Sequence, residues 1–246
     1  MNANASDNVP DALGAGTGTS MLRVVSYNVR AFKDDTDALR RVVRALNPDV
    51  LCLQEVPRHP LSGHRIADFA ASCGLYWAGG HRGRMSTTLF TALRVDVLSS
   101  GHRLLPVRRP DEPRGYAFAQ LQLPGHRPLT AVSVHLSLRS AERPAHAALL
   151  RRAAELGDDV PLVVAGDINE THDGKAWAEL SRELEDANGD VLTFPSSKPV
   201  KRIDAIFASP TLKPVRPSLE LDEADLVAAT DHRPLYLDLD LTPLKV

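Results

Sequence analysis

The sequence predicts an α/β protein in which two β-sheets pack together and helices cover their outer faces. From Leu22 onward, short apolar runs rich in branched residues alternate with segments of helical periodicity. Several of these runs, such as 162–165, are apolar without alternation, which is typical of sheets buried on both faces. With 246 residues, of which 43% are hydrophobic, the chain is long enough to bury one sizeable core.

The apolar runs and the periodic segments give the expected elements in chain order. Strands are expected at 22–28, 50–56, 87–91, 95–99, 117–123, 129–136, 162–166, 203–208 and 234–241. Helices are expected at 36–46, 140–156 and 173–185. The first helix is the best defined, because Leu39, Val42, Val43 and Leu46 recur at the spacing of one helical face.

Residues 1–20 differ in composition from the rest of the chain. They are small, polar and rich in glycine, without periodicity, which predicts a disordered tail. Residues 21–246 are expected to form a single domain, since no linker or repeat interrupts them. Met21 stands directly before the first expected strand. A translation start at Met21 instead of Met1 is therefore a hypothesis, which N-terminal sequencing of the native protein tests.

The charge balance does not indicate a nucleic-acid partner, although it leaves one open. The 29 basic and 31 acidic residues give a formal net charge of −2, whereas nucleic-acid-binding domains are usually strongly basic.

No apolar stretch approaches the roughly 20 residues that span a bilayer, and the N-terminus lacks the features of a secretory signal. Cys52 and Cys73 lack a metal-ligand spacing and are expected to be buried thiols. We therefore expect a cytoplasmic protein without a membrane span. A monomer is expected because no heptad or exposed apolar stripe stands out.

Polar side chains follow four of the apolar runs at their C-terminal ends. Asn28 follows the first run, Glu55 the second, His135 the sixth and Asp167 the seventh. Burying a carboxylate costs much free energy unless it is paired or binds a cation. These residues are therefore expected to share one polar site.

Two later segments add two carboxylates and a histidine. Asp204 lies in the segment 202–207, and Asp231 and His232 precede the last expected strand. Oxygen ligands from asparagine and carboxylates favour a hard cation such as Mg²⁺ or Mn²⁺. Zinc is not indicated, because the chain lacks HExxH and paired CxxC patterns.

Each of these residues alone also has a structural explanation. Glu55 is compatible with a solvated charge at a strand end, and His135 with a hydrogen-bonded core histidine. Asp167 followed by Asn169 is a common turn pair. Their occurrence together, in order along one chain, favours a functional site.

The ordered set of motifs resembles the endonuclease/exonuclease/phosphatase superfamily. The similarity runs from about residue 22 to residue 241, through the segments SYNV, LQEV, VSVHLS, VVAGDINE, RIDAIF and TDHRP. The GDxN and (S/T)DH elements together are highly specific. The resemblance implies a four-layer α/β/β/α sandwich of two mixed β-sheets flanked by helices, with the site at one sheet edge.

The resemblance also implies a metal site. It makes Glu55 the principal ligand of a Mg²⁺ or Mn²⁺ ion, supported by Asn28 and Asp231. Arg114 stands where many members carry an arginine that reaches phosphate, with a solvated loop arginine as the alternative. Arg30 departs from the pattern, since some nuclease members carry an acidic residue there.

The remaining residues take catalytic roles by the same resemblance. Asp167 positions or deprotonates the attacking water, and Asn169 hydrogen-bonds the phosphate or the nucleophile. His232 contacts the phosphate and is oriented by Asp204, while His135 is a second histidine on the scissile phosphate. Protonated histidines and a metal ion would both stabilise the negative charge that grows on the phosphoryl oxygens.

The sequence therefore predicts divalent-metal-dependent hydrolysis of a phosphoester, by a phosphodiesterase or a phosphatase acting on a small or exposed substrate. A nuclease acting on DNA or RNA is the first alternative, and it needs a basic surface that the composition does not indicate. A non-catalytic binding module with the same fold is the second alternative, because a fold alone does not establish an activity.

Overall fold

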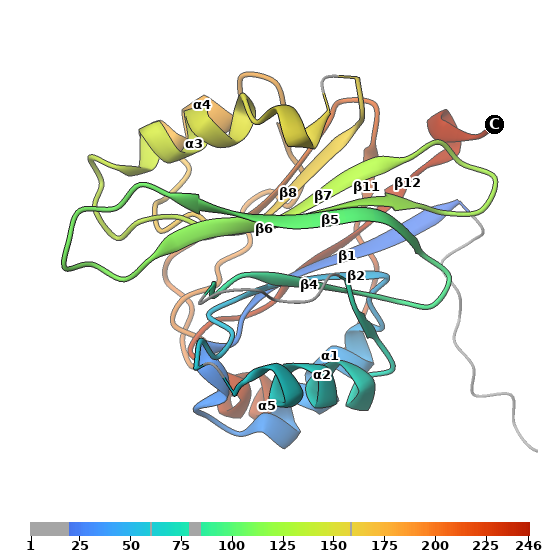
Figure 1. Ribbon diagram of the computed structural model, residues 1–246. Helices are drawn as coiled ribbons and strands as arrows, with labels where there is room; N and C mark the ends of the chain where they lie inside the picture. The colour runs from blue at the N-terminus through green and yellow to red at the C-terminus, as the bar shows by residue number, and fades with distance from the viewer. Residues whose placement is uncertain (1–19, 60, 79–84, 158) are drawn as a thin grey trace, which may run out of the picture.

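The computed structural model describes residues 20–59, 61–78, 85–157 and 159–246. Over these residues the chain forms two β-sheets that pack face to face, with helices on both outer faces (Figure 1). The predicted four-layer α/β/β/α sandwich of two mixed sheets is therefore confirmed. The expected tail and the hypothesis about Met1 fall on residues 1–19, which lie outside the described residues; only Ser20 of the tail is described.

The first sheet contains, among the described residues, strands in the order β11-β12-β1-β2-β4-β3. These strands are β1 (Met21–Asn28), β2 (Val50–Gln54), β3 (Tyr76–Trp77), β4 (Thr88–Thr91), β11 (Lys213–Val215) and β12 (Leu235–Asp240). β1 and β2 are parallel, and the other neighbours are antiparallel. The C-terminal residues of β1 and β2, Asn28 and Gln54, are consequently paired in the register.

The second sheet has the order β5-β6-β7-β8-β10-β9 over the same described ranges. These strands are β5 (Asp96–Leu105), β6 (Arg114–Gln122), β7 (Leu129–His135), β8 (Leu162–Asp167), β9 (Glu185–Asp186) and β10 (Asp204–Ala208). β7 and β8 are parallel, and the other pairs are antiparallel. The parallel pair places His135 beside Asp167.

Helices cover the outer face of each sheet (Figure 1). The first sheet packs against α1 (Thr36–Leu46), α2 (Gly63–Ser72) and α5 (Glu223–Ala229), and the second against α3 (Arg143–Arg151) and α4 (Lys175–Leu180). Short 3₁₀ turns lie at Arg30–Phe32, Ala154–Leu156 and Thr242–Leu244. In the part of the chain that the structure describes, no helix is both long and apolar enough to cross a membrane.

Helix α1 has the bounds that the sequence predicts, because both of its ends are specified locally. The Asp35 carboxylate accepts hydrogen bonds from the backbone N–H groups of Asp37 (2.9 Å) and Ala38 (3.0 Å), which caps the N-terminus. Asn47 ends the helix in the left-handed region, with φ 47°. The predicted apolar face of Leu39, Val42, Val43 and Leu46 is buried.

The other helices depart from the prediction. The expected helix 140–156 is shorter, because α3 begins at Arg143 with Pro144 in its first turn and is followed by a 3₁₀ turn. The expected helix 173–185 ends at Leu180, because the chain turns back to pair β9 with β10. The seven-residue α5 and the two- or three-residue strands β3, β9 and β11 were not predicted, since short elements show too little periodicity. The ten-residue α2 was not predicted either. Cys52 is buried as expected, whereas Cys73 is only partly buried.

Alternate residues of each strand face opposite layers. In β8, Val163 and Ala165 belong to the core between the sheets, while Val164 belongs to the core beneath α3 and α4. In β1, Val24 faces the other sheet and Val25 faces the helices. Polar residues that continue the inward series at the strand ends are therefore directed into the space between the two sheets.

A left-handed turn follows β1 and fastens it to the end of β2. Arg30, Ala31 and Phe32 have φ values of 43°, 56° and 54°, a region that costs L-residues roughly 1–2 kcal/mol each. The turn is held because the Ala31 N–H donates to the Glu55 carbonyl oxygen at 2.6 Å and Phe32 is buried against Phe69. Conformational strain is thus concentrated beside the strand ends that carry Asn28 and Glu55.

Replacing Ala31 by glycine should relieve this strain. We expect Ala31→Gly to raise the free energy of unfolding by roughly 0.5–1 kcal/mol, because glycine adopts positive φ without a Cβ penalty. The control is Ala45→Gly at an exposed position inside α1, which should lower it by about 1 kcal/mol. Chemical denaturation of both variants measures the difference, and a destabilised Ala31→Gly would contradict the strain.

Close packing of β8 against β7 should make Gly166 irreplaceable. A Cβ at Gly166 would lie 2.0 Å from the Val134 carbonyl oxygen, which is backbone and cannot move aside. We expect Gly166→Ala to lower the free energy of unfolding by about 3 kcal/mol or more. Gly63→Ala is the control, because no atom lies within 4 Å of its Cβ position and α2 begins there. Equal denaturation midpoints for the two variants would show that the strands can separate locally.

Candidate active site

The register of the second sheet brings three predicted site residues into one row. His135 of β7 pairs with Asp167 of β8, and Asp167 pairs with Asp204 of β10. Each residue continues the inward series of its strand, so the three side chains point into the space between the sheets. His135, Asp167 and Asp204 are all buried.

Glu55 reaches the same space by a different route. Gln54 is the last inward residue of β2, so simple alternation would direct Glu55 toward the helices. Glu55 instead has φ 53°, and its chain direction changes there, with the next N–H, of Val56, bonded to the Ser86 carbonyl oxygen at 2.9 Å. The left-handed residue therefore turns the Glu55 carboxylate toward the row of the second sheet.

Asn28 connects the two sheets at this end of the core. Its Nδ2 donates to Glu55 Oε1 at 3.2 Å and to Asp167 Oδ2 at 3.1 Å. Its Oδ1 accepts from the Arg30 N–H at 3.1 Å, and its carbonyl oxygen accepts from Thr230 Oγ1 at 3.0 Å. In this arrangement the Asn28 amide holds the two carboxylates at a fixed separation.

His232 and Asp204 form a buried pair. His232 Nδ1 lies 2.9 Å from Asp204 Oδ2, and its other nitrogen, Nε2, lies 3.9 Å from Asp167 Oδ2. Burial opposes protonation, but Asp204, together with Asp167 and Asp231, raises the pKa of His232 to about 9. The Phe194 ring, with its centroid 5.0 Å from that of His232, fixes the imidazole from the side. At neutral pH His232 is therefore an imidazolium.

Asp167 lies at the centre of the cluster. Burial and the neighbouring Asp204 carboxylate raise the pKa of Asp167 to about 7, although His232 and hydrogen bonds act in the opposite direction. Asn169, with φ 57°, donates its N–H to Asp167 Oδ1 at 2.9 Å, and its Nδ2 donates to the Leu136 carbonyl oxygen at 3.0 Å. The Asp167–Asn169 pair is thus a turn pair that also fixes the buried carboxylate.

His135 differs from His232 in its charge. Arg114 Nη1 lies 2.9 Å from each ring nitrogen of His135, and His135 Nε2 lies 3.5 Å from Asp167 Oδ2. Burial lowers the pKa of His135 well below its ordinary value, and the cations Arg114 and His232 lower it further. The pKa shifts thus favour protonation of His232 and disfavour protonation of His135, whereas the resemblance implied protonated histidines at both positions.

Two groups of side chains have the spacing of a metal site. Glu55, His135 and Asp167 offer ligand atoms within 4.8 Å of one another, and so do Asp167, Asp204 and His232. Asp231, expected as a supporting ligand, belongs to neither group; its Oδ2 lies 3.4 Å from Arg30 Nε at the rim. The basic residue that departs from the motif pattern thus faces the acidic residue expected near the metal.

A buried polar network lies between the two sheets, next to the site residues and further from the strand ends. The sequence analysis did not identify it. Gln54 Nε2 donates to Ser133 Oγ at 3.1 Å, and Ser133 Oγ donates to the Leu53 carbonyl oxygen at 2.8 Å, which ties β2 to β7. Ser26 Oγ lies 3.5 Å from Gln54 Oε1. Ser26 and Ser133 stand two residues before Asn28 and His135, so the period of two along a strand would have identified them.

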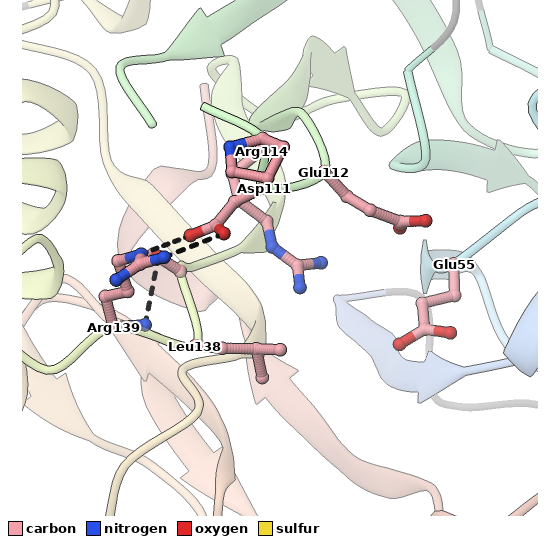
Figure 2. Close-up of a pocket in the computed structure, with 8 residues that line it drawn as sticks. Glu55, Asp111, Glu112, Arg114, Leu138 and Arg139 are labelled. Carbon is pink, nitrogen blue, oxygen red and sulfur yellow. Dashed lines mark hydrogen bonds and ion pairs between the residues drawn. The ribbon is translucent and has the colours of Figure 1, made fainter. Parts of the chain in front are cut away.

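A cavity of about 520 Å³ opens beside Glu55 and Arg114. Figure 2 shows the side chains of these two residues directed toward each other across it. The rest of the lining comes from two loops: Pro110, Asp111, Glu112, Ser137, Leu138 and Arg139. No sequence pattern marks these loop residues, because only the fold brings the two loops together.

Solved structures of several proteins share this fold. A conserved protein of unknown function from Enterococcus faecalis V583 superposes with a TM-score of 0.74 at 17% identity, covering 89% of this chain and 99% of that chain. The mannosyl-6-phosphatase of Bacteroides thetaiotaomicron gives 0.70 at 20% identity, covering 89% and 99%. The human Nocturnin catalytic domain with bound sulfate gives 0.71 at 20% identity, covering 91% and 95%. Likeness at these identities shows a shared fold.

Comparison of sequences identifies a related protein and the family. The chain is 29% identical over 238 residues to YbhP, an uncharacterised protein of Escherichia coli strain K12, which covers 82% of this chain and 87% of YbhP. The sequence model of the endonuclease/exonuclease/phosphatase family matches residues 25–232, which include every predicted site residue from Asn28 to His232. The matched stretch spans most of the chain and the whole polar cluster, and the protein belongs to the endonuclease/exonuclease/phosphatase family.

Proposed function

We propose that this protein is a divalent-metal-dependent phosphoesterase that hydrolyses a small or exposed phosphoester by attack of water. Members of its family are hydrolases that act on phosphoesters. The observation that carries the proposal is the buried cluster in which Asp167 lies between Asn28, His135 and the His232–Asp204 pair. An anionic phosphoester needs both a base for water and positive groups for its oxygens, and this cluster supplies both kinds.

The donor set fits a hard divalent cation such as Mg²⁺ or Mn²⁺. Glu55, Asp167 and Asp204 bring three carboxylates into one partly enclosed cluster, and negative charge buried in this way is compensated by a cation. We assign Glu55 as the principal ligand and Asn28 as a supporting ligand; Asp231, our other proposed supporting ligand, would have to exchange its contact with Arg30 for the ion. When bound, the ion supplies positive charge for a non-bridging phosphoryl oxygen.

Asp167, Asn169 and His232 have separate roles in the proposed reaction. Asp167 accepts a proton from water as the water oxygen forms its bond to phosphorus and the bond to the departing oxygen breaks. Asn169 holds the Asp167 carboxylate through its N–H, and we assign its side chain to the phosphate or the nucleophile. Imidazolium His232, oriented by Asp204, contacts the phosphoryl group.

Two further groups face the phosphate in this proposal. Arg114 has no carboxylate within ion-pair distance among the described residues, so its guanidinium is available to a phosphoryl oxygen from the cavity. His135, neutral and hydrogen-bonded to Arg114, contributes a hydrogen bond rather than a charge. We also propose that the protein acts as a cytoplasmic monomer.

A nuclease that uses the same cluster is the alternative proposal. Affinity for nucleic acid falls steeply with salt because counterions are released on binding, whereas hydrolysis of a small phosphoester depends on salt only weakly. The formal net charge of −2 favours the small phosphoester.

Asp167→Asn should abolish most of the activity. We expect kcat to fall by on the order of 10²-fold or more, because the amide cannot accept the proton of water. The assay is hydrolysis of bis(p-nitrophenyl) phosphate and p-nitrophenyl phosphate with Mg²⁺, Mn²⁺ or EDTA, and the preferred ester separates a diesterase from a monoesterase. Asp225→Asn, in the exposed Arg41–Asp225 ion pair, is the control. Wild-type rates in Asp167→Asn would remove Asp167 from the mechanism.

Glu55→Gln should weaken metal binding more than it affects the stability of the fold. We expect the Mg²⁺ or Mn²⁺ affinity, measured by titration calorimetry, to fall by at least about 10-fold, because a charged ligand is replaced by a neutral one. Glu183→Gln, an exposed position beyond α4, should leave the affinity unchanged. Absence of metal binding at millimolar concentration in the wild-type protein would instead support a non-catalytic binding module.

A further inference from the structure

A buried ion pair joins α3 to the segment that follows β8, and the proposed reaction does not use it. Arg143, the first residue of α3, donates from Nε to Glu170 Oε2 at 2.8 Å. The two side chains are 11% and 8% exposed, so the pair is largely removed from water. Glu170 directly follows Asn169, which the proposed function assigns to the phosphate or the nucleophile. The pair is therefore adjacent in the chain to a residue of the site.

The Glu170 carboxylate is fixed to the start of α4. Its other oxygen, Oε1, accepts hydrogen bonds from the backbone N–H groups of Ala176 (2.5 Å) and Trp177 (3.0 Å). Both of these residues are buried in the core beneath α3 and α4. A Cβ at Gly174 would lie 2.2 Å from Glu170 Cδ, so the carboxylate in this position requires a glycine there. Glu170 is thus attached to a part of the structure that cannot easily move.

Arg143 also contacts the segment that follows β7. Its Nη1 donates to the Leu138 carbonyl oxygen at 3.0 Å and lies 3.4 Å from the Ser137 carbonyl oxygen. A guanidinium holds its N–H donors in a rigid plane, so Nε and Nη1 fix Glu170 and this segment relative to each other. Arg143 thereby connects the segments that follow the two parallel strands β7 and β8.

Asn169 lies between these attachments. Its Nδ2 donates to the carbonyl oxygen of Leu136, in the segment that Arg143 holds, at 3.0 Å. Its own φ of 57° is left-handed, a conformation that persists only where surrounding contacts hold it. Because Glu170 is fixed on one side and the Leu136 segment on the other, the plane of the Asn169 amide is set by both. That plane determines where the amide presents Oδ1 and its second N–H.

We propose that Arg143 and Glu170 are positioning residues, which act on the reaction through Asn169 by fixing the orientation of its amide. The inference rests on the proposed function, because that function gives Asn169 its role. Neither Arg143 nor Glu170 needs to contact the substrate. A displacement of about 1 Å at the reacting atoms can lower a rate by on the order of 10²-fold, so even a partial loss of this support should reduce kcat.

Two conservative variants remove the support and keep most of the structure. Arg143→Lys keeps a positive charge opposite Glu170, but one ammonium group cannot reproduce the contacts with both Glu170 and the Leu138 carbonyl oxygen. Glu170→Gln keeps an oxygen for the first turn of α4 and replaces the acceptor that faces Arg143. We expect each variant to lower kcat for the preferred p-nitrophenyl ester by about 10-fold, at a temperature where denaturation curves show folded protein. The Mg²⁺ affinity should not change, because Asn28 and Glu55 come from the other sheet.

The matched control is the ion pair at the other end of the same helices. Arg151, the last residue of α3, lies 3.1 Å from Glu179 of α4, with exposed fractions of 16% and 12%. Arg151→Lys and Glu179→Gln make the same chemical changes away from the segments after β7 and β8. Their kcat should stay within about twofold of the wild type, because distant sites act independently. Equal losses of kcat at both pairs would show a contribution to stability alone and overturn the inference.

A double-mutant cycle tests whether the effect passes through Asn169. Asn169→Gly removes the amide and provides a residue that adopts positive φ without strain. In that background Arg143→Lys should change kcat by less than about twofold, because the group that it positions is absent. A second loss of the full size would contradict the coupling.

The outcomes separate this inference from the proposed function. Absence of hydrolysis of any phosphoester by the wild type, with any divalent ion, overturns both. If the wild type is active, an undiminished kcat in Arg143→Lys or in Asn169→Gly overturns the inference alone. Losses that occur at Arg143 and Glu170, are absent at Arg151 and Glu179, and disappear in the Asn169→Gly background support it.

Discussion

The burial of Asp167 at the junction of the two sheets is the constraint on which the rest of the site depends. A carboxylate in this position is stable only if neighbouring groups compensate for the lost water. Asn28 from the first sheet and the Asn169 N–H from its own turn donate to it, and His232 places a positive charge 3.9 Å away. Any change in the packing of the two sheets therefore alters the environment of the central carboxylate.

Much of this arrangement could be predicted from the sequence, because strand geometry is regular. Side chains repeat with a period of two, so polar residues at the ends of buried runs must emerge at the same edge as their parallel neighbours. This reasoning places Asn28, His135 and Asp167 together, and the structure does so. The same regularity explains why helix α1 and most of the nine expected strands are found close to their predicted bounds, whereas the strand expected at 95–99 continues to Leu105 as β5.

The remainder could not be predicted because it depends on local exceptions and on contacts distant in sequence. Glu55 faces the site through a left-handed residue, which alternation alone would exclude. The pKa of His135 is lowered by its burial and further by Arg114, which lies against its ring from a neighbouring strand. Asp231 faces Arg30 rather than either group with metal-ligand spacing, a consequence of the turn after β1 that no motif records.

The two kinds of structural control have different consequences for function. Within the candidate site, Asn28, His135, Asp167 and Asp204 are placed by backbone register, which cannot change by small steps, since a shift of one residue reverses every side chain. The cavity beside it is shaped by ion pairs between loops, Asp111–Arg139 and Glu112–Arg58, which single substitutions can remove while the strands stay in place. Substitutions in these loops can therefore change the lining of the cavity without moving Asn28, His135, Asp167 or Asp204, whose positions depend on the pairing of the strands.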